Sequence, residues 1–465
     1  MDEDIKRNSF SGSLGFILAA SGSAVGLGNI WRFPYLAAKD GGGLFLFIYI
    51  ILAISFGFTL LISEIAIGRK TKQSPLIAYG ELNSRWKPLG FGSLIIPVLI
   101  LPYYCVIGGW VLKYFFVFLT GNGAAAAEDG YYTSFISDIS SPVIMFLVFL
   151  TITFLIVLGG VEKGIEKFSK IIMPLLIFLV IAIAAYSATM THTDTYGETR
   201  TGLEGLKILF IPNFKTITFH NLFVTVMDAM GQLFYSLSVA MGVMITFGSY
   251  MRDDTNLPRS VYRIELFDTL VAFLAGAMII PSVYVFIGQE GMRESGPGLM
   301  FVSLPKVFFQ MGTIGNVVGC LFFAMVLLAA VTSSVSMMEA VVSCFIDAFK
   351  MARKNAALFE CMICIFIGLL VCLGYNIFYF EVRLPNGINA QILDILDYLS
   401  NNIFMPLVSA GTCLLVGWVL GPEEIISEIV KNGETFSRKK LFVFMIRYIA
   451  PIMLAVLMFK AIGFF

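Results

Sequence analysis

The sequence predicts an all-α polytopic membrane protein that contains two inverted repeats. Hydrophobic residues make up 58% of the 465 residues and charged residues only 13%, against about 25% charged in ordinary soluble domains, and the mean hydropathy is +0.86. Apolar runs long enough to cross a bilayer recur along the whole chain. The first and the sixth of these runs are interrupted, and corresponding broken helices in two halves are typical of inverted repeats. A water-soluble globule is excluded.

We count roughly eleven apolar runs of about 20 residues or more. They lie near residues 14–38, 43–68, 90–120, 142–160, 166–187, 219–250, 261–288, 313–348, 357–377, 391–420 and 441–463. We expect the chain, 1–465, to form a single membrane domain, with a first inverted repeat over 14–187, a second over 219–420 and an additional helix over 441–463.

Lysine and arginine are concentrated in alternate loops. Lys6 and Arg7 precede the first run, and further cations follow runs two, four, six, eight and ten. Because short cytoplasmic loops carry this excess, the N-terminus is expected in the cytoplasm and, with an odd number of spans, the C-terminus outside. No small-residue cleavage site follows the first run, so it is expected to be a retained helix and not a signal peptide.

The first run is broken between Gly22 and Pro34, where three glycines accompany Asn29 and Arg32. Backbone freed from a helix survives at membrane depth only where it lines a cavity or binds a ligand. An arginine at that depth is a functional-site hypothesis by default. The segment therefore indicates a binding site inside the membrane.

The second break is the segment from Ser236 to Gly242, which places two hydroxyls and two small residues inside the run 219–250. It follows the first break by five spans, the spacing expected of an inverted-repeat transporter with its site near the midplane. The alternative is that small residues only allow close helix packing. The presence of Asn29 and Arg32 in the first break argues against it.

Other compositional features exclude several classes of protein. The net charge is zero, so no nucleic-acid partner is expected. The seven cysteines all fall in apolar segments, and the pair Cys361 and Cys364 has no second ligand pair, which favours helix packing over metal binding.

No phosphate-binding P-loop is present, and Asp268 and Glu64 lack the arrangement of a catalytic pair. Neither ATP drive nor enzymatic activity is expected.

The run from Gly22 to Pro34, followed by three glycines at 41–43, resembles the opening of neurotransmitter:sodium symporters, especially their bacterial amino-acid transporters. Further matching motifs follow in order: Ser63-Glu64, Gly68-Arg69, Tyr103-Tyr104, Gly108-Gly109-Trp110, Gly164-Ile165-Glu166-Lys167, Thr332-Ser333-Ser334 and Asp397. The resemblance implies two inverted five-helix repeats, spans 1–5 and 6–10, with helices 1 and 6 broken, plus an eleventh helix. It also implies a bacterial cytoplasmic (inner) membrane.

Two sodium sites are implied by the resemblance. Sodium 1 would be held by the Ala24 carbonyl, Asn29, Ser236 and Asp268, together with the carboxylate of the substrate. Sodium 2 would be held by carbonyls of Gly22, Val25 and Ala329 and by the hydroxyls of Thr332 and Ser333. Sodium is a hard cation that prefers oxygen ligands, although hydroxyls bonded to their own helix are the alternative for the Thr332 and Ser333 pair. A ligand shared with the substrate would couple the two solutes reciprocally.

A half-helix N-terminus suits the carboxylate of an amino acid. We expect the amides of Leu27 and Gly28 and the Tyr104 hydroxyl to bind the carboxylate, and carbonyls of Ala24, Tyr235 and Ser236 with the Ser238 hydroxyl to bind the ammonium group. By resemblance the side-chain pocket is lined by Ile100, Tyr104, Tyr235, Ala240, Met241, Ser333 and Met337. None of these is charged, so the substrate side chain should be neutral.

Two departures from the family pattern bear on the size of that pocket. Tyr235 stands where an apolar aromatic residue is usual, and Ala240 where the family mostly has glycine. Each takes room, which favours a small or medium apolar side chain. Flexible Met241 and Met337 could repack around a larger one, so an aromatic substrate is the alternative.

A chloride requirement is not expected. Tyr49, Gln232, Ser236 and Asp268 match the surroundings of the family's chloride site, and many bacterial relatives have an acid at the position of Ala272. Asp268 can supply the negative charge instead and offset that of sodium. A buried neutral Asp268 is the alternative.

Paired gates are implied on both sides of the site. Outside, Arg32 and Asp397 should face each other, with Asp394 as the alternative partner and Tyr104 and Tyr235 forming a lid. Inside, Arg7 matches the family's ion-pair position opposite Asp347, with Tyr250 close by, and Phe10 stands where tryptophan is frequent.

These features together predict a sodium-coupled symporter of neutral amino acids that works by alternating access. A channel and a non-transporting amino-acid sensor are the alternatives from other classes. The expected partners are the amino acid and the lipid bilayer, and the oligomeric state is left open.

Overall fold

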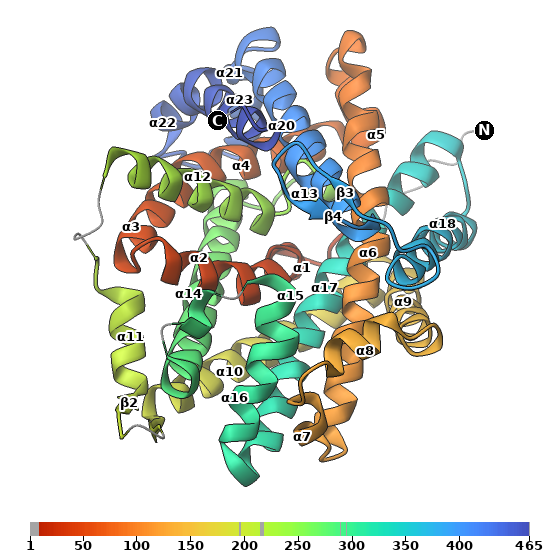
Figure 1. The fold of residues 1–465 in the computed structure, drawn as a ribbon. Coiled ribbons are helices and arrows are strands. Elements are labelled where there is room, and N and C mark those ends of the chain that lie inside the picture. Colours follow the sequence, from red (N-terminus) through yellow and green to blue (C-terminus); the bar gives the residue numbers. More distant parts are fainter. Residues whose placement is uncertain (1–8, 195–196, 214–217, 289, 294, 465) are drawn as a thin grey trace.

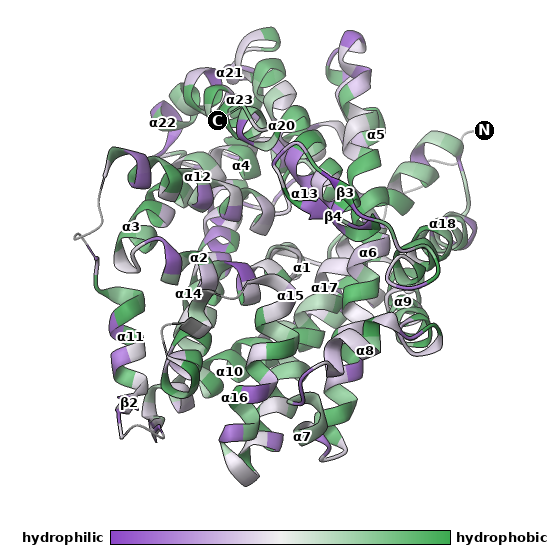
Figure 2. Ribbon diagram, in the orientation of Figure 1, coloured by the Kyte–Doolittle hydropathy of each residue, from purple (hydrophilic) through white to green (hydrophobic). Residues whose placement is uncertain are grey.

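The computed structural model describes residues 9–194, 197–213, 218–288, 290–293 and 295–464. Helices dominate these residues, and long helices run side by side through the molecule (Figure 1). Hydrophobic residues cover most of their length, whereas hydrophilic ones gather at ends and connections such as the tip of α5 and the loop around β2 (Figure 2). Large apolar side chains are exposed on the outer helices, for example Phe178 at 65% and Phe366 at 68%. A lipid environment explains such exposure, because soluble monomers avoid broad apolar surfaces.

Ten segments of the described chain are long and apolar enough to span a membrane, if the bent pair at the start is taken as one. The first half contains α1 (Ser13–Ala24), a π-helical turn (Gly28–Arg32) and α2 (Phe33–Lys39); α3 (Gly43–Leu52), a π-helical turn (Ala53–Gly57) and α4 (Phe58–Thr71); α6 (Lys87–Leu119); α9 (Ser140–Leu158); and a π-helical turn (Val161–Glu166) with α10 (Lys167–Thr189).

The second half has the same kind of elements. They are α12 (Phe219–Ser236) and α13 (Val243–Ser249); α14 (Leu257–Ile287); α17 (Gly315–Phe349); α18 (Arg353–Leu373); α19 (Ile392–Asp397), a π-helical turn (Tyr398–Phe404), α20 (Met405–Leu414) and a π-helical turn (Leu415–Val419); and α22 (Lys439–Phe444), a π-helical turn (Met445–Ile449) and α23 (Ala450–Ala461).

Short elements form the connections. They are α5 (Pro75–Leu82), a 3-10 turn (Ser84–Trp86), α7 (Gly123–Ala126), α8 (Tyr131–Ser137), β1 (Thr191–Thr193), β2 (Thr199–Thr201), α11 (Gly202–Phe210), a 3-10 turn (Glu290–Arg293), α15 (Gly296–Gly298), a π-helical turn (Leu299–Ser303), α16 (Leu304–Gln310), a 3-10 turn (Gly312–Ile314), β3 (Val382–Arg383), β4 (Asn389–Ala390) and α21 (Pro422–Ile429). The strands pair as two antiparallel hairpins, β1 with β2 and β3 with β4.

The predicted fold class, an all-α polytopic membrane protein, is confirmed. The run expected at 219–250 is not among the ten segments that are long and apolar enough to span a membrane, because it is divided into α12 and α13. Polar residues His220, Asn221, Asp228 and Gln232 also lower the hydropathy of α12. The two small hairpins were not expected from the sequence.

The broken first span lies at the centre of the bundle, where α1 packs against α14 and α17, and α17 packs against α6 (Figure 1). Nearly all of α1 is buried, as is most of α6 and α17. A polar site at the break of α1 is therefore enclosed by protein and not by lipid, the condition under which irregular backbone is tolerated at membrane depth.

Candidate functional site

The first break frees backbone carbonyls near the centre of the molecule. Helix α1 ends at Ala24, and the axis turns by 53° before α2. The amide of Gly26 bonds Asn29 Oδ1 (3.3 Å) and that of Leu27 bonds the Tyr104 hydroxyl (3.5 Å). These amides would bond the carbonyls of Gly22 and Ser23 in a continuous helix. Both carbonyls instead accept hydrogen bonds from Ser333 Oγ, at 3.4 and 3.2 Å.

The second break lies between α12 and α13 and has three residues in left-handed backbone. Ser238, Ala240 and Gly242 have φ angles of 53°, 67° and 71°. Glycine adopts such angles without strain, whereas alanine and serine do not. Buried Glu64 holds this backbone by accepting the Ala240 amide at 2.6 Å.

The two breaks contact each other directly. Ser238 Oγ donates to the Ser23 carbonyl at 3.1 Å, and Ser23 Oγ donates to Ser238 Oγ at 3.2 Å. Gln232 on α12 donates to the carbonyl of Gly28 at 3.1 Å. Serine side chains therefore replace helical bonds that are missing at the first break, and Gln232 adds a second donor to the Gly28 carbonyl, which already accepts the Phe33 amide.

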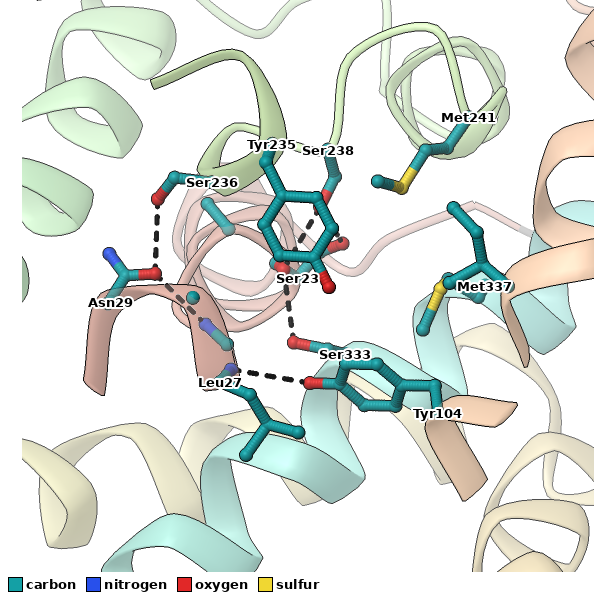
Figure 3. A pocket seen from close by; sticks show the side chains of 14 residues that line it. Ser23, Leu27, Asn29, Tyr104, Tyr235, Ser236, Ser238, Met241, Ser333 and Met337 are labelled. Atoms are coloured by element: carbon teal, nitrogen blue, oxygen red, sulfur yellow. Dashed lines mark hydrogen bonds between the residues drawn. The ribbon is translucent and has the colours of Figure 1, made fainter. Parts of the chain in front are cut away.

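A cavity lies between these breaks (Figure 3). Fourteen residues line it: Ser23, Ala24, Gly26, Leu27, Gly28, Asn29, Ile100, Tyr104, Tyr235, Ser236, Ser238, Met241, Ser333 and Met337. None of them is charged. The volume open to the centre of a water molecule is about 20 Å³, close to the minimum that holds one water. A larger ligand requires side chains to move, and Met241 and Met337 border the cavity (Figure 3).

Eleven of the twelve residues predicted to bind the substrate line this cavity, and Ala240 does not. Ala240 is fully buried, its amide bonds Glu64 and its carbonyl accepts a hydrogen bond from Ser93 at 3.1 Å. In this left-handed conformation the Ala240 amide and carbonyl both bond residues that do not line the cavity. The expectation that the Ala240 methyl narrows the pocket is therefore not supported by its position.

Three of the four residues predicted for sodium 1, Asn29, Ser236 and Asp268, are in contact. Asp268 Oδ1 accepts hydrogen bonds from Ser236 Oγ (2.6 Å) and Asn29 Nδ2 (2.8 Å), and Ser236 Oγ also approaches Asn29 Oδ1 at 3.1 Å. Tyr49 bonds the second carboxylate oxygen at 3.4 Å. Asn29 and Asp268 are fully buried. The oxygen-rich donor set, with one carboxylate, fits a hard monovalent cation.

The residues predicted for sodium 2 lie between α1 and α17. Thr332 Oγ1 donates to the Ala329 carbonyl at 2.9 Å, and Ser333 Oγ bridges α17 to the carbonyls of Gly22 and Ser23. Val25 is fully buried at the end of α1. Gly22 faces Thr332 closely, because a Cβ on Gly22 would lie 3.3 Å from the Thr332 Cβ. The predicted ligands are all oxygen atoms, which again fits sodium, although Met173 Sδ also lies beside Gly22.

On one side of the cavity, Tyr235 separates it from a second cavity of about 160 Å³ that Arg32, Asn401 and Lys460 also line. Asp397 accepts hydrogen bonds from Asn401 (2.6 Å) and Tyr103 (3.0 Å). Among the described residues Arg32 forms no ion pair with Asp397 or Asp394, but it does interact electrostatically with Asp397. Asp394 accepts the Gln391 amide at the start of α19. The facing gate of Arg32 and Asp397 stays a prediction.

On the opposite side, Arg7 lies outside the described residues. Asp347 accepts the Ser74 amide at 2.6 Å, and the Tyr250 hydroxyl donates to Glu339 at 2.8 Å. Glu339 also forms an ion pair with Arg353, which donates further to the Val157 carbonyl at 3.0 Å.

Phe10 is buried on the same side, with its ring against those of Phe16 and Phe247. Glu339 and Arg353 were not among the residues predicted to be functional. The available signals were an acid inside the apolar run 313–348 and an arginine just after it.

The thiol pair Cys361 and Cys364 lies on α18. Cys364 Sγ contacts Glu360 at 3.4 Å, and no metal-binding group of three His, Cys, Asp or Glu side chains occurs in the part of the chain that the structure describes. These cysteines pack between helices.

Comparisons with known proteins agree with this geometry. A model of the sodium:neurotransmitter symporter family matches residues 7–129 and 132–465. An uncharacterized sodium-dependent transporter of Bacillus subtilis, YhdH, is 32% identical and covers 98% of this chain and 97% of its own length. The sodium- and chloride-dependent GABA transporter 2 of Rattus norvegicus is 25% identical over 92% of this chain and 75% of its own.

Among solved structures, a crystal structure of MhsT in complex with L-phenylalanine matches with a TM-score of 0.84 and 34% identity, over 98% of this chain and all of that one. The chain therefore belongs to the sodium:neurotransmitter symporter family and is a sodium-dependent transporter, not an enzyme.

Proposed function

We propose that the protein is a symporter that moves a neutral L-amino acid together with sodium by alternating access. The observation that carries this proposal is an uncharged cavity placed between two helix breaks and bordered by two clusters of oxygen donors. Oxygen ligands from broken helices are the usual means by which such folds bind sodium near the midplane.

The amino and carboxyl groups of the substrate have defined places in this proposal. The amides of Leu27 and Gly28 lie where the π-helical turn begins, and the Tyr104 hydroxyl lies 3.5 Å from the Leu27 nitrogen. The positive end of this half-helix attracts a carboxylate. The carbonyls of Ala24, Tyr235 and Ser236 and the Ser238 hydroxyl would accept the ammonium protons.

Coupling follows from the position of Asn29. Its Oδ1 accepts the Gly26 amide and its Nδ2 bonds Asp268, so the sodium 1 cluster borders the cavity that would hold the carboxylate. A substrate carboxylate there would complete the sodium coordination. Each solute then raises the affinity for the other by the same factor.

The side chain of the substrate is expected to be apolar, since Ile100, Met241 and Met337 line that part of the cavity without a charge. We favour a small or medium side chain because the cavity is narrow. An aromatic amino acid is the second candidate, supported by the phenylalanine named for MhsT and by the flexibility of the two methionines.

We also infer two sodium ions per cycle, transport without chloride, and an N-terminus in the cytoplasm of a bacterial inner membrane. Asp268 provides the fixed negative charge that a chloride ion would otherwise supply. Inverted repeats over 14–187 and 219–420, with 441–463 added, remain part of this proposal.

A competition screen tests the substrate. Purified protein in proteoliposomes with an inward sodium gradient would take up labelled alanine or leucine, and each of the twenty amino acids would be added in excess. Neutral apolar amino acids should compete, and acidic and basic ones should not. Uptake against a gradient also separates a symporter from a channel or a sensor, because neither of these accumulates its ligand.

The size of the pocket can be tested with Met241→Ala. The shorter side chain enlarges the cavity and should shift competition toward larger side chains. A methylene in such a pocket is worth about 1–3 kcal/mol of discrimination. If wild type already prefers tryptophan and the variant changes nothing, the small-substrate assignment fails and the aromatic one stands.

A further inference from the structure

A third cavity, separate from the transport site, opens where α1 and α14 begin. Its volume is about 360 Å³, and its lining includes Gly12 and Ser13 at the start of α1 and Arg252, Asn256, Arg259 and Arg263 around the start of α14. Helix α1 packs against α14, so the cavity joins two elements that are far apart in sequence.

The charges around this cavity do not balance. Asp254 also lines the cavity and is paired with Arg252 at 2.8 Å. Asp253 forms ion pairs with Lys72 (3.0 Å) and Lys431 (3.5 Å). The hydrogen bond from Lys72 holds the pKa of Asp253 below its usual range, so this carboxylate stays ionised and engaged with its lysines. One strong cationic cluster is left on α14.

That cluster consists of Arg259 and Arg263, which form no ion pair with any carboxylate of the described chain and are exposed. They are four residues apart on one helix, so their guanidinium groups lie on the same face and repel each other. Glu265, two residues on, is already paired with Arg438 at 3.0 Å. An anion between the two arginines would remove this repulsion and gain charge-assisted hydrogen bonds.

The helix ends contribute less than the arginines. At α14 the Asn256 side chain caps the helix by accepting the Arg259 amide. At α1 no side chain caps Gly12, but the buried Glu166 already accepts the Ser11 amide and hydroxyl there. The positive potential of the helix dipoles therefore only adds to the charge of the two arginines.

Exposed apolar side chains lie next to the cavity. Leu14, directly after Ser13, is 59% exposed, and Leu266, three residues after Arg263, is 65% exposed. In a membrane protein such side chains contact acyl chains. A ligand that combines a phosphate with acyl chains therefore matches the site better than a soluble anion does.

We propose that this cavity binds the headgroup phosphate of an anionic phospholipid, with Arg259 and Arg263 on the phosphate and the acyl chains along Leu14 and Leu266. The bound lipid holds the start of α1 against α14. This proposal does not depend on which amino acid is transported.

The test uses the full chain, purified in detergent and depleted of lipid, with lipid binding followed by native mass spectrometry. Dioleoyl phosphatidylglycerol and dioleoyl phosphatidylcholine share the same acyl chains, so the difference between them reports the headgroup. Wild type should bind one phosphatidylglycerol about tenfold or more tightly than phosphatidylcholine, given the attraction of two arginines for an anionic lipid.

The variant Arg259→Gln/Arg263→Gln should bind phosphatidylglycerol no better than phosphatidylcholine. Arg263→Gln alone should give an intermediate affinity and guards against a folding defect in the double variant. The matched control is Lys354→Gln/Lys440→Gln, which removes the same charge from two exposed lysines placed on the same side by the predicted topology. It should keep wild-type affinity.

Two results would overturn the proposal. One is equal binding of phosphatidylglycerol by wild type and the arginine double variant. The other is displacement of phosphatidylglycerol by millimolar inorganic phosphate, which would assign the cavity to a soluble anion. Neither outcome bears on the sodium sites, because Arg259 and Arg263 lie outside them.

Discussion

The Asn29 side chain donates a hydrogen bond to Asp268 Oδ1 at 2.8 Å and so joins the broken first span to the middle of α14. Ser236, at the end of α12, bonds the same carboxylate oxygen at 2.6 Å. Three spans that are distant in sequence thus meet at one buried acid. Because a mid-membrane carboxylate is costly without a partner, this junction is the natural place for a cation.

Asp268→Asn should abolish most uptake at ordinary chloride concentrations. The variant loses the only carboxylate of the sodium 1 cluster, and if its amide oxygen keeps the bonds from Ser236 and Asn29, its NH2 group faces the Tyr49 hydroxyl, which already donates. We expect a loss of about tenfold or more, equivalent to about 1.4 kcal/mol of ion binding. High chloride should restore part of the uptake, because an anion can replace the missing charge. Initial rates in sodium chloride and sodium gluconate measure this effect.

The control for that measurement is Asp129→Asn, an exposed carboxylate in a loop that pairs with Lys306. It should leave uptake unchanged in both media. A large drop of wild-type uptake in gluconate would show that Asp268 does not supply the negative charge.

Ala240→Gly is expected to stabilise the protein slightly and to leave substrate preference unchanged. A left-handed alanine costs about 1–2 kcal/mol of backbone strain. Ordering a glycine costs about 0.5–1 kcal/mol more conformational entropy than ordering an alanine. The net gain should raise the melting temperature on the order of 1 °C. Ala275→Gly, inside α14, is the matched control and should lower it by the usual helix penalty. A shift toward larger substrates in Ala240→Gly would restore the idea that its methyl narrows the pocket.

Arg353→Gln should destabilise the protein strongly. Glu339 is fully buried, so removal of its cation leaves a charge whose remaining hydrogen-bond partner among the described residues is Tyr250, at a cost of about 3–5 kcal/mol. The double variant Glu339→Gln/Arg353→Gln should recover much of this loss, because no charge then remains buried. Thermal unfolding in sodium buffer measures both.

Lys306→Gln, which breaks an exposed ion pair, is the comparison and should cost about 0–1 kcal/mol. An Arg353→Gln variant no less stable than Lys306→Gln would mean that the Glu339 pair contributes nothing.

The sequence predicted the broken first span and the polar region around it because glycine, asparagine and arginine are unusual in an apolar run. It also predicted that Ser333 and Tyr104 belong to the same region, through the family resemblance. Side-chain partners that depend on helix rotation could not be predicted in this way. Asp397 bonds Tyr103 and Asn401 and not Arg32, and nothing in the residue pattern distinguishes these alternatives.

The position of Ala240 illustrates the same limit. Its residue type suggested added bulk in the pocket, but the left-handed backbone at 238 to 242 and the hydrogen bond to Glu64 decide where its atoms point. Such backbone angles are set by tertiary contacts. The Glu339 and Arg353 pair was missed for a related reason, since the two residues come from different helices and meet only when α17 and α18 pack.

The driving ion is the central claim, and initial uptake of a labelled neutral amino acid in sodium and in potassium media tests it most directly. We expect uptake only with sodium, and about a tenfold lower sodium affinity in Thr332→Ala, which removes one oxygen from the cage between α1 and α17. Equal uptake of the wild type in the two media would contradict the assignment of sodium symport.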